Sequence, residues 1–364
     1  MFTLSPGPSQ ISPETKKDIH AAVDSGILEL NHRGTRFTEL SKLCSEELRT
    51  YLNVPKGYRI FYFDSASHVW HSMVANTVKK TSFHFAHGSF SAKAPQASEL
   101  LHKEALSVEV PWGEQCDFRG TKIPARAELI TACFNETSTG VKMTDTEIGY
   151  LHKKYPKTLL AIDITSSAGA VPNAISDADI WYFSVQKGFG LPAGLAIAIV
   201  SPSAYDRSVA LAKKGQNRAG IWAWGRLEET MTGGLYQTQH TPNVLNIYLL
   251  GKQCERWNKD GGLKKRTLET LRKKELFETW ISRMKSCTHF VIDAKHRSDT
   301  VFVVQAEPAQ VQKAKEDLKQ HGIELGAGYG KIKKDTFRIA NFPAITEAML
   351  EKTLELLGYH FNNL

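Results

Sequence analysis

The stretch SVQKGFGLPAGLAI, Ser184–Ile197, places one lysine, Lys187, between an apolar strand-like run and a turn with three glycines and a proline. No acidic residue lies within seven positions of Lys187 on either side. Lysine is rarely buried without a partner, so this side chain either points into water or has an amine that is used in chemistry. The strand before it also bears on the fold, because ligand sites of parallel α/β sheets lie at the carboxyl ends of strands.

Strand-like runs alternate with helical stretches along the first two thirds of the chain. Seven such runs cover residues 59–63, 82–86, 106–111, 128–134, 159–165, 180–185 and 195–200, and helical patterns at 69–80, 96–104 and 145–153 separate several of them. This alternation predicts an α/β fold with a seven-stranded, mostly parallel sheet that is covered on both faces.

The pattern changes after Pro242. Helices are predicted at 244–258 and 263–284, and two later strands, 300–305 and 336–341, flank a helix at 309–320. A chain of 364 residues also exceeds the usual size of one domain. We therefore expect a large α/β domain at residues 15–250 and a smaller α+β domain at 251–364, with residues 1–14 packing on the smaller one.

The composition excludes several classes of function. The net charge is +8, but the basic residues lie in short pairs without interleaved aromatics, which favours binding of small anions over nucleic acid. None of the five cysteines has CxxC or metal-ligand spacing, so we expect no metal site and a reducing compartment. The first ten residues lack the apolar core of a signal peptide, and the longest apolar run, 191–200, is too short to span a bilayer. These features predict a cytoplasmic protein without membrane contact.

Polar residues follow the predicted strands at the same edge of the sheet as Lys187. Asp163 ends the fifth run, 24 residues before Lys187, the fourth run leads into FNETSTG (134–140), and the first leads into DSASH (64–68) before a helix. A desolvated lysine loses its proton easily and attacks carbonyl carbon, while a helix start with serines suits a phosphate. The carboxylate of Asp163 would suit a cofactor with a protonated ring nitrogen. Together the amine, the carboxylate and the helix start indicate pyridoxal phosphate, whose aldehyde Lys187 would bind.

Longer segments also match a known family in order along most of the chain. They are LSPGP (4–8), NHRG (31–34), FNET (134–137), AIDITSS (161–167), VQKGFGLPAGLAI (185–197), HTPNVLNIYLL (240–250) and Arg338. On these segments the sequence resembles the class V, fold-type I pyridoxal-phosphate aminotransferases, and among them most closely the phosphoserine aminotransferases. The resemblance implies a homodimeric transaminase of L-phosphoserine and 2-oxoglutarate in serine biosynthesis.

The resemblance also implies roles around the cofactor ring. Lys187 would bind the cofactor covalently and then move a proton between the substrate Cα and the cofactor C4′. Asp163 would keep the ring nitrogen protonated, and Thr137 would donate to the phenolic oxygen. Phe90 stands where the family stacks a tryptophan on the ring.

The cofactor phosphate and the second subunit are implied in the same way. Ala66, Ser67 and Gln186 would meet the phosphate, with His240 and Thr241 reaching in from the partner chain of the homodimer. His240 stands where the family has an asparagine, which retains a donor and adds a possible pH dependence.

Three further residues would hold the substrate, a small anionic amino acid or 2-oxo acid. Arg338 would grip the α-carboxylate as a bidentate fork, and His32 and Arg33 would face the distal anion across the dimer interface.

Two departures from the family pattern bear on the substrate. Ser67 stands where phosphoserine aminotransferases usually carry an arginine, and the stretch GAGYGKIKKD (326–335) lacks their His-Arg pair. Lys331 or Lys333 could substitute as point charges. An alanine–glyoxylate or serine–pyruvate type aminotransferase therefore stays open as an alternative, as do a cofactor-binding regulatory homologue and a class V lyase or desulfurase.

Each predicted site residue also has an ordinary structural interpretation. Lys187 could be solvated, Asp163, Ser65 and Ser67 could cap helices, and Phe90 could belong to the core. The pairs at 32–33 and 240–241 could be surface turns, and the lysines at 331–334 a solvated loop.

Overall fold

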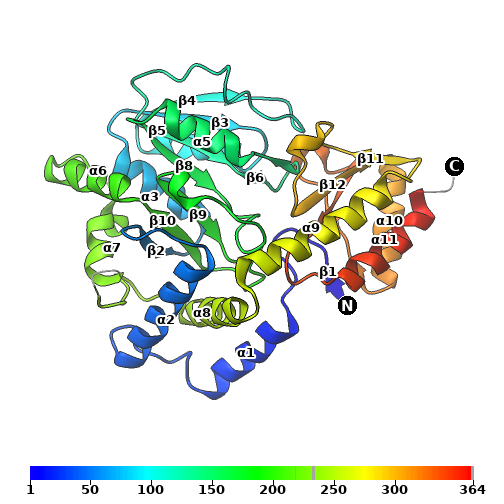
Figure 1. The fold of residues 1–364 in the computed structure, drawn as a ribbon, viewed down its shortest axis with the longest axis horizontal. Helices are drawn as coiled ribbons and strands as arrows, with labels where there is room; N and C mark the ends of the chain where they lie inside the picture. Colours follow the sequence, from blue (N-terminus) through cyan, green and yellow to red (C-terminus); the bar gives the residue numbers. More distant parts are fainter. Residues whose placement is uncertain (218, 232–233, 362–364) are drawn as a thin grey trace.

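The computed structural model describes residues 1–217, 219–231 and 234–361, and its larger part is a layered α/β structure (Figure 1). Seven strands form one sheet in the order β2-β10-β9-β8-β5-β3-β4. Their bounds are β2 (Arg59–Phe63), β3 (Thr81–Ala86), β4 (Glu104–Glu109), β5 (Leu129–Cys133), β8 (Leu159–Asp163), β9 (Ile180–Ser184) and β10 (Ala196–Val200). Only β10 runs antiparallel to its neighbours, β2 and β9, so the predicted mostly parallel seven-stranded sheet is confirmed.

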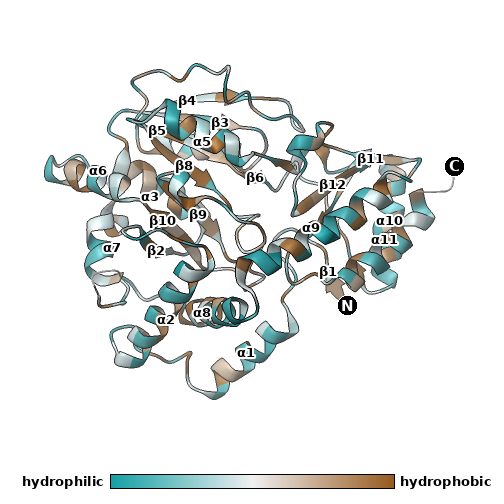
Figure 2. Ribbon diagram, in the orientation of Figure 1, coloured by the Kyte–Doolittle hydropathy of each residue, from teal (hydrophilic) through white to brown (hydrophobic). Residues whose placement is uncertain are grey.

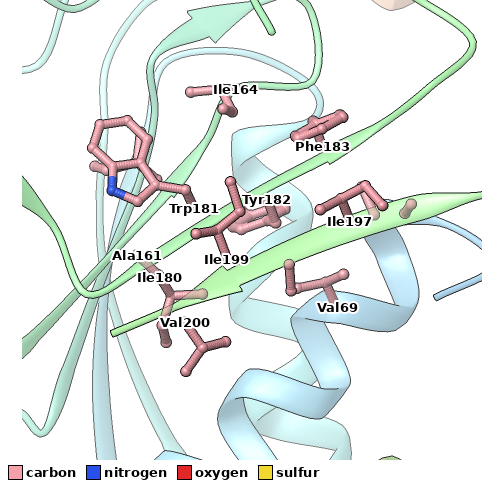
Figure 3. Packing of buried hydrophobic residues seen from close by; sticks show 14 of the residues in the cluster. Val69, Ala161, Ile164, Ile180, Trp181, Tyr182, Phe183, Ile197, Ile199 and Val200 are labelled. Carbon is pink, nitrogen blue, oxygen red and sulfur yellow. The ribbon is translucent and has the colours of Figure 1, made fainter. Parts of the chain in front are cut away.

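Apolar strands buried on both faces hold this sheet in the core. Every residue of β9 and β10 is buried, as expected for central strands rich in isoleucine, valine and aromatic residues. Figure 3 shows Val69 of α3 (Ala66–Thr77) packed close to residues of these strands, and Trp70 beside it donates from Nε1 to the Tyr182 hydroxyl at 3.1 Å. The helix is thereby fixed against the sheet next to the end of β2.

The remaining helices of the larger part lie around the sheet and turn polar faces outward (Figure 2). They are α1 (Pro13–Asp24), α2 (Thr35–Tyr51), α4 (Ala94–Leu100), α5 (Asp145–Lys154), α6 (Pro202–Lys213), α7 (Trp224–Met231) and α8 (Val244–Lys259). Ser12 and Pro13 are a typical N-cap and first helical residue and predict a helix that extends to about residue 28, but α1 is shorter. It ends at Asp24 because Gly26 adopts a φ of 68°, which ends a helix.

The predicted start of α3 at residue 69 is also wrong. The helix begins at Ala66 because Ser65 is its N-cap, with a hydroxyl that accepts from the His68 N–H at 3.4 Å. The correction matters for the site, since it puts Ala66 and Ser67 in the first turn, where the N–H groups have no partners inside the helix.

The smaller part consists of a four-stranded sheet, β11-β12-β15-β14, and three helices. Their bounds are β11 (Cys287–His289), β12 (Val301–Ala306), β14 (Gly326–Ala327), β15 (Thr336–Ala340), α9 (Gly262–Ile281), α10 (Pro308–Gln320) and α11 (Glu347–Phe361). Two of the four strands, β11 and β14, are too short to show a pattern in the sequence. Near the N-terminus, β1 (Phe2–Thr3) pairs in parallel with β13 (Ile323–Glu324), and Leu4 joins the apolar cluster of this part.

The division of the chain into two domains near residue 250 stays a prediction. It is supported by separate apolar clusters, one from Phe37 to Leu263 and one formed by Leu4 and residues from Phe277 to Phe361. The end of the predicted small domain, residues 362–364, lies outside the described residues. Among the helices of the described part of the chain, none combines the length and the apolar character needed to cross a membrane.

Candidate active site

Lys187 is buried at the carboxyl end of β9, with only 8% of its surface exposed, so its side chain does not point into water. Its Nζ donates to the Thr137 hydroxyl at 2.6 Å and lies 4.6 Å from the centre of the Phe90 ring. The N-terminal segment fixes its backbone, because Ser9 donates from N to the Gln186 carbonyl (2.9 Å) and from Oγ to the Lys187 carbonyl (2.8 Å).

The lysine lines a cavity of about 120 Å³ at the edge of the sheet. The sheet strands β5, β8 and β9, the start of α3 and the loops that carry Phe90 and Thr137 contribute the other walls. The lining residues are Ser65, Ala66, Ser67, Trp70, Phe90, Cys133, Asn135, Thr137, Asp163, Thr165, Ser184, Gln186 and Lys187. All seven residues that we predicted to contact the cofactor from the same chain are therefore brought together.

Burial shifts the amine and the carboxyl group of this cavity toward their neutral forms. It lowers the pKa of Lys187, and the nearby carboxylates of Asp163 and Glu136 offset only part of that effect. Burial also raises the pKa of Asp163. The hydrogen bonds from Thr165 and the charge of Lys187 lower this pKa, but by less than burial raises it. One of these bonds runs from the Thr165 N–H to Oδ1 at 2.8 Å. A lysine with a lowered pKa has more neutral amine, which is the nucleophilic form.

The N-terminus of α3 points its first residues at the same cavity. Ser65, Ala66 and Ser67 all line it, and the N–H of Ala66 donates to the Ser184 hydroxyl at 2.8 Å. Unpaired N–H groups and the helix dipole make such an end a site for an anion. Ser184 was not predicted, although its place at the end of β9 is a signal of the kind that identified Asp163.

Arg338 lies beside the cavity, on β15 of the smaller part. Its Nη1 donates to the Thr137 carbonyl at 3.0 Å and its Nε to the Ala327 carbonyl at 2.7 Å. Burial lowers its pKa to about 10, and no described carboxylate lies within ion-pair distance of it. A buried guanidinium without a carboxylate partner is suited to an anionic ligand.

Tyr329 connects this arginine with the cavity and was missed by our sequence analysis. Its ring centre lies 5.1 Å from that of Phe90 and 5.3 Å from the Arg338 guanidinium carbon. An aromatic residue between two glycines, as in GAGYGK, is the signal that could have drawn attention to it.

The four residues predicted to come from a second subunit do not line the cavity of their own chain, among the residues that the structure describes. Arg33 is exposed and donates to the Gln237 side chain (3.3 Å) and the Gln239 carbonyl (3.4 Å). Burial, Arg33 and His240 lower the pKa of the half-buried His32. His240 lies 4.0 Å from the Asp64 carboxylate with its ring edge-on to Trp222, and Thr241 is exposed. The two segments thus lie close together within one chain.

Comparison with known proteins identifies the family. Residues 5–332 match the model of the family "Aminotransferase class-V". The chain belongs to this family. A phosphoserine aminotransferase from Corynebacterium glutamicum (strain R) is 29% identical over 355 residues, which cover 95% of this chain and 90% of that protein.

Two solved structures show which members of the family this chain is similar to. A phosphoserine aminotransferase from Cytophaga hutchinsonii ATCC 33406 shares 32% identity over 98% of both chains, with a TM-score of 0.94. A phosphoserine aminotransferase from Trichomonas vaginalis, solved with pyridoxal phosphate bound, shares the fold at 19% identity and a TM-score of 0.81, over 97% of this chain and 98% of that one. The chain is accordingly a pyridoxal-phosphate-dependent aminotransferase, and its fold is that of fold type I.

The side chains of this class-V aminotransferase suit that cofactor. One cavity offers a buried amine, a buried carboxylate and a helix N-terminus, which match the aldehyde, the ring nitrogen and the phosphate of pyridoxal phosphate. Phe90, next to the Lys187 amine, supplies an aromatic face for the ring.

Proposed function

We propose that this class-V aminotransferase transfers the amino group of L-phosphoserine to 2-oxoglutarate, the transamination step of serine biosynthesis. The observation that carries the proposal is the likeness to the phosphoserine aminotransferase of Cytophaga hutchinsonii, at 32% identity over 98% of each chain. The alternatives, a lyase or a non-enzymatic homologue, are less well supported, because the matching family model and the relatives described above are aminotransferases.

The residues of the cavity divide the chemistry between them. Pyridoxal phosphate supplies an aldehyde that bonds to amines and a ring that accepts the electron pair of the broken Cα–H bond. Lys187 would hold the cofactor and then, as the free amine, take the proton from the substrate Cα and deliver it to the cofactor C4′. Asp163 holds the proton on the ring nitrogen. Ser67, Gln186 and the first N–H groups of α3 bind the phosphate, and Thr137 binds the phenolic oxygen.

The substrate has two anionic ends, and different arginines bind them. Arg338 takes the α-carboxylate, which is supported by its burial without a carboxylate partner. His32 and Arg33 of the second subunit take the distal phosphate or γ-carboxylate. Lys331 belongs to the loop between β14 and β15, and its amine lies 4.9 Å from the centre of the Trp112 ring. It can replace the missing His-Arg pair only if its side chain moves away from this ring.

The enzyme acts as a homodimer with composite sites. Large apolar side chains near the two predicted interface segments are exposed in the single chain, and a second subunit would cover them; they are Val23, Leu28, Ile221 and Leu235. The hydrogen bonds of Arg33 to residues 237 and 239 hold the two segments together, which supports both of them reaching the partner's site. All five cysteines are buried and free, which suits a cytoplasmic location.

A panel of amino donors with three acceptors tests the substrate. Phosphoserine with 2-oxoglutarate is expected to outperform alanine with glyoxylate and serine with pyruvate. Arg33→Ala is expected to raise the activation free energy calculated from kcat/KM by several kcal/mol for phosphoserine and glutamate and to leave that for alanine nearly unchanged. Because Ser67 offers fewer donors than an arginine, the alanine–glyoxylate or serine–pyruvate type is the second candidate. A preference for alanine or serine, with equal effects of Arg33→Ala on all donors, would favour it.

A further inference from the structure

Glu136 is a fully buried carboxylate next to the site that the proposed mechanism does not use. Five donors surround it. Oε2 accepts from the N–H and the hydroxyl of Ser91, both at 2.8 Å, and Oε1 accepts from the N–H of Phe90 at 3.3 Å. Oε1 also accepts from the N–H of Ser138 at 3.1 Å and from its hydroxyl at 2.6 Å. So complete a set of donors favours the ionised form.

The donors come from two loops, and each loop carries a residue that faces Lys187. Phe90 and Ser91 follow β3, and the Phe90 ring lies 4.6 Å from the Lys187 amine. Thr137 lies between Glu136 and Ser138, and its hydroxyl accepts from that amine at 2.6 Å. The Thr137 carbonyl also accepts from Arg338. One carboxylate therefore joins the backbones that position the ring, the hydroxyl and, through Thr137, the arginine.

Gly88 gives independent support for this role. A Cβ at this position would lie 2.3 Å from Cγ and 2.6 Å from Cδ of Glu136, far inside van der Waals contact. The φ of Gly88 lies outside the left-handed region, so its backbone conformation does not require glycine. The close approach of the carboxylate explains why a side chain is excluded here.

The surroundings of Glu136 favour its ionised form despite its burial. Burial alone would raise the pKa of this carboxyl, but His87 and the hydrogen bonds from Ser138 and Ser91 outweigh it and hold the pKa below the usual value. An ionised carboxylate accepts from all five donors at once, whereas a protonated acid or an amide would turn a donor toward one of them.

We propose that Glu136 is a positioning residue, whose carboxylate sets the Phe90 ring and the Thr137 hydroxyl against the Lys187 amine. The proposal rests on the proposed role of Lys187 as the lysine that binds the cofactor. Glu136 itself touches neither cofactor nor substrate in this scheme. Its loss should leave the covalent bond to Lys187 intact and change the orientation of the bound ring.

Two variants test this role from opposite sides. Glu136→Gln keeps the size and removes the charge, and Gly88→Ala keeps the charge and displaces the carboxylate. Full-length proteins loaded with pyridoxal phosphate are compared by visible absorbance, by circular dichroism of the absorbance band and by kcat/KM. Both variants should keep the absorbance band, lose at least about half of its circular dichroism, and show kcat/KM lower by roughly tenfold to a hundredfold. Glu99→Gln, an exposed change on the neighbouring α4, should match the wild type.

The outcomes separate positioning from a merely structural role. If both variants are less stable but retain wild-type circular dichroism and kcat/KM, the inference is overturned. If Glu136→Gln fails to fold, Gly88→Ala and the milder Ser91→Ala, which removes one donor, decide the question by the same measurements. If the wild type shows no cofactor band, or Lys187→Ala retains one, the proposed function fails first and this inference falls with it.

Discussion

At the scale of single residues, the site depends on an amine and a carboxylate that share one small cavity. Burial lowers the pKa of Lys187 and raises that of Asp163, so each group is easier to neutralise than in water. A bound cationic ring nitrogen would reverse this effect at Asp163, because an adjacent positive charge favours the carboxylate.

Lys187→Ala is expected to abolish the visible absorbance of the purified enzyme and to lower transamination by at least roughly a hundredfold, because it removes both the cofactor bond and the proton carrier. The absorbance spectrum and a single-turnover assay measure the two effects. The exposed Lys213→Ala on α6 serves as the control. Normal turnover by Lys187→Ala would refute the assignment.

Asp163→Asn is expected to retain the cofactor but to slow the reaction by at least roughly a hundredfold. The amide is nearly the same size and can still accept from the Thr165 N–H, but it lacks the charge that keeps the ring nitrogen protonated. Cofactor content and kcat are measured on the same preparation. A loss of less than about threefold would count against this role for Asp163.

The sequence could predict those residues whose position follows from a strand end. Lys187, Asp163 and Thr137 were found in this way, since the carboxyl ends of neighbouring parallel strands meet at one edge. Tyr329 could not be found so, because its contacts with Phe90 and Arg338 depend on how a loop of the smaller part meets the larger part. Glu136 was visible as a residue after the fourth strand, but its five donors come from tertiary structure.

At the scale of elements, the sheet of the larger part was predictable because five of its strands, β2, β5, β8, β9 and β10, are mostly apolar runs of five residues between clear breaks. The first residues of helices were less predictable from the sequence, and α3 shows the physical reason. Its cap, Ser65, is followed by two small residues that carry no apolar periodicity, so the pattern begins only at Val69. The helix start was therefore predicted too late, and the first turn that it omitted contains the predicted phosphate contacts Ala66 and Ser67.

On α9, the buried Lys273 donates to the carbonyls of Phe342 (2.9 Å) and Ile345 (2.7 Å), just after the strand that carries Arg338. Burial lowers its pKa to about 8 from the ordinary lysine value of 10.5. Between these values the unfolded chain binds a proton that the folded chain lacks, so the free energy of unfolding should rise with pH from about 8 upward. The rise is at most about 3 kcal/mol, because the two carbonyls favour the charged form.

Urea unfolding at pH 7.5 to about 10 measures this dependence as the difference between the wild type and Lys273→Met. The variant should lack the rise, while Lys264→Met, at an exposed position on the same helix, should retain it. An identical pH dependence of all three proteins would show that Lys273 keeps its ordinary pKa in the fold.

At the scale of the whole molecule, each active site should combine two chains. In this arrangement the cavity residues would come from one subunit, and the segments around Arg33 and His240 would come from the other. If so, subunits with Lys187→Ala and subunits with Arg33→Ala should complement each other. In a heterodimer one composite site receives both changes and the other receives neither. A random equal mixture should then recover about one quarter of the wild-type activity, since half of its dimers are heterodimers with one intact site.

Mixing Lys187→Ala with Asp163→Asn subunits is the matched control, because both residues belong to the same chain's cavity and every site of the heterodimer carries one change. Recovery in the first mixture alone supports shared sites, and equal failure of both mixtures, with heterodimers verified by mass spectrometry, would show that each chain completes its own site.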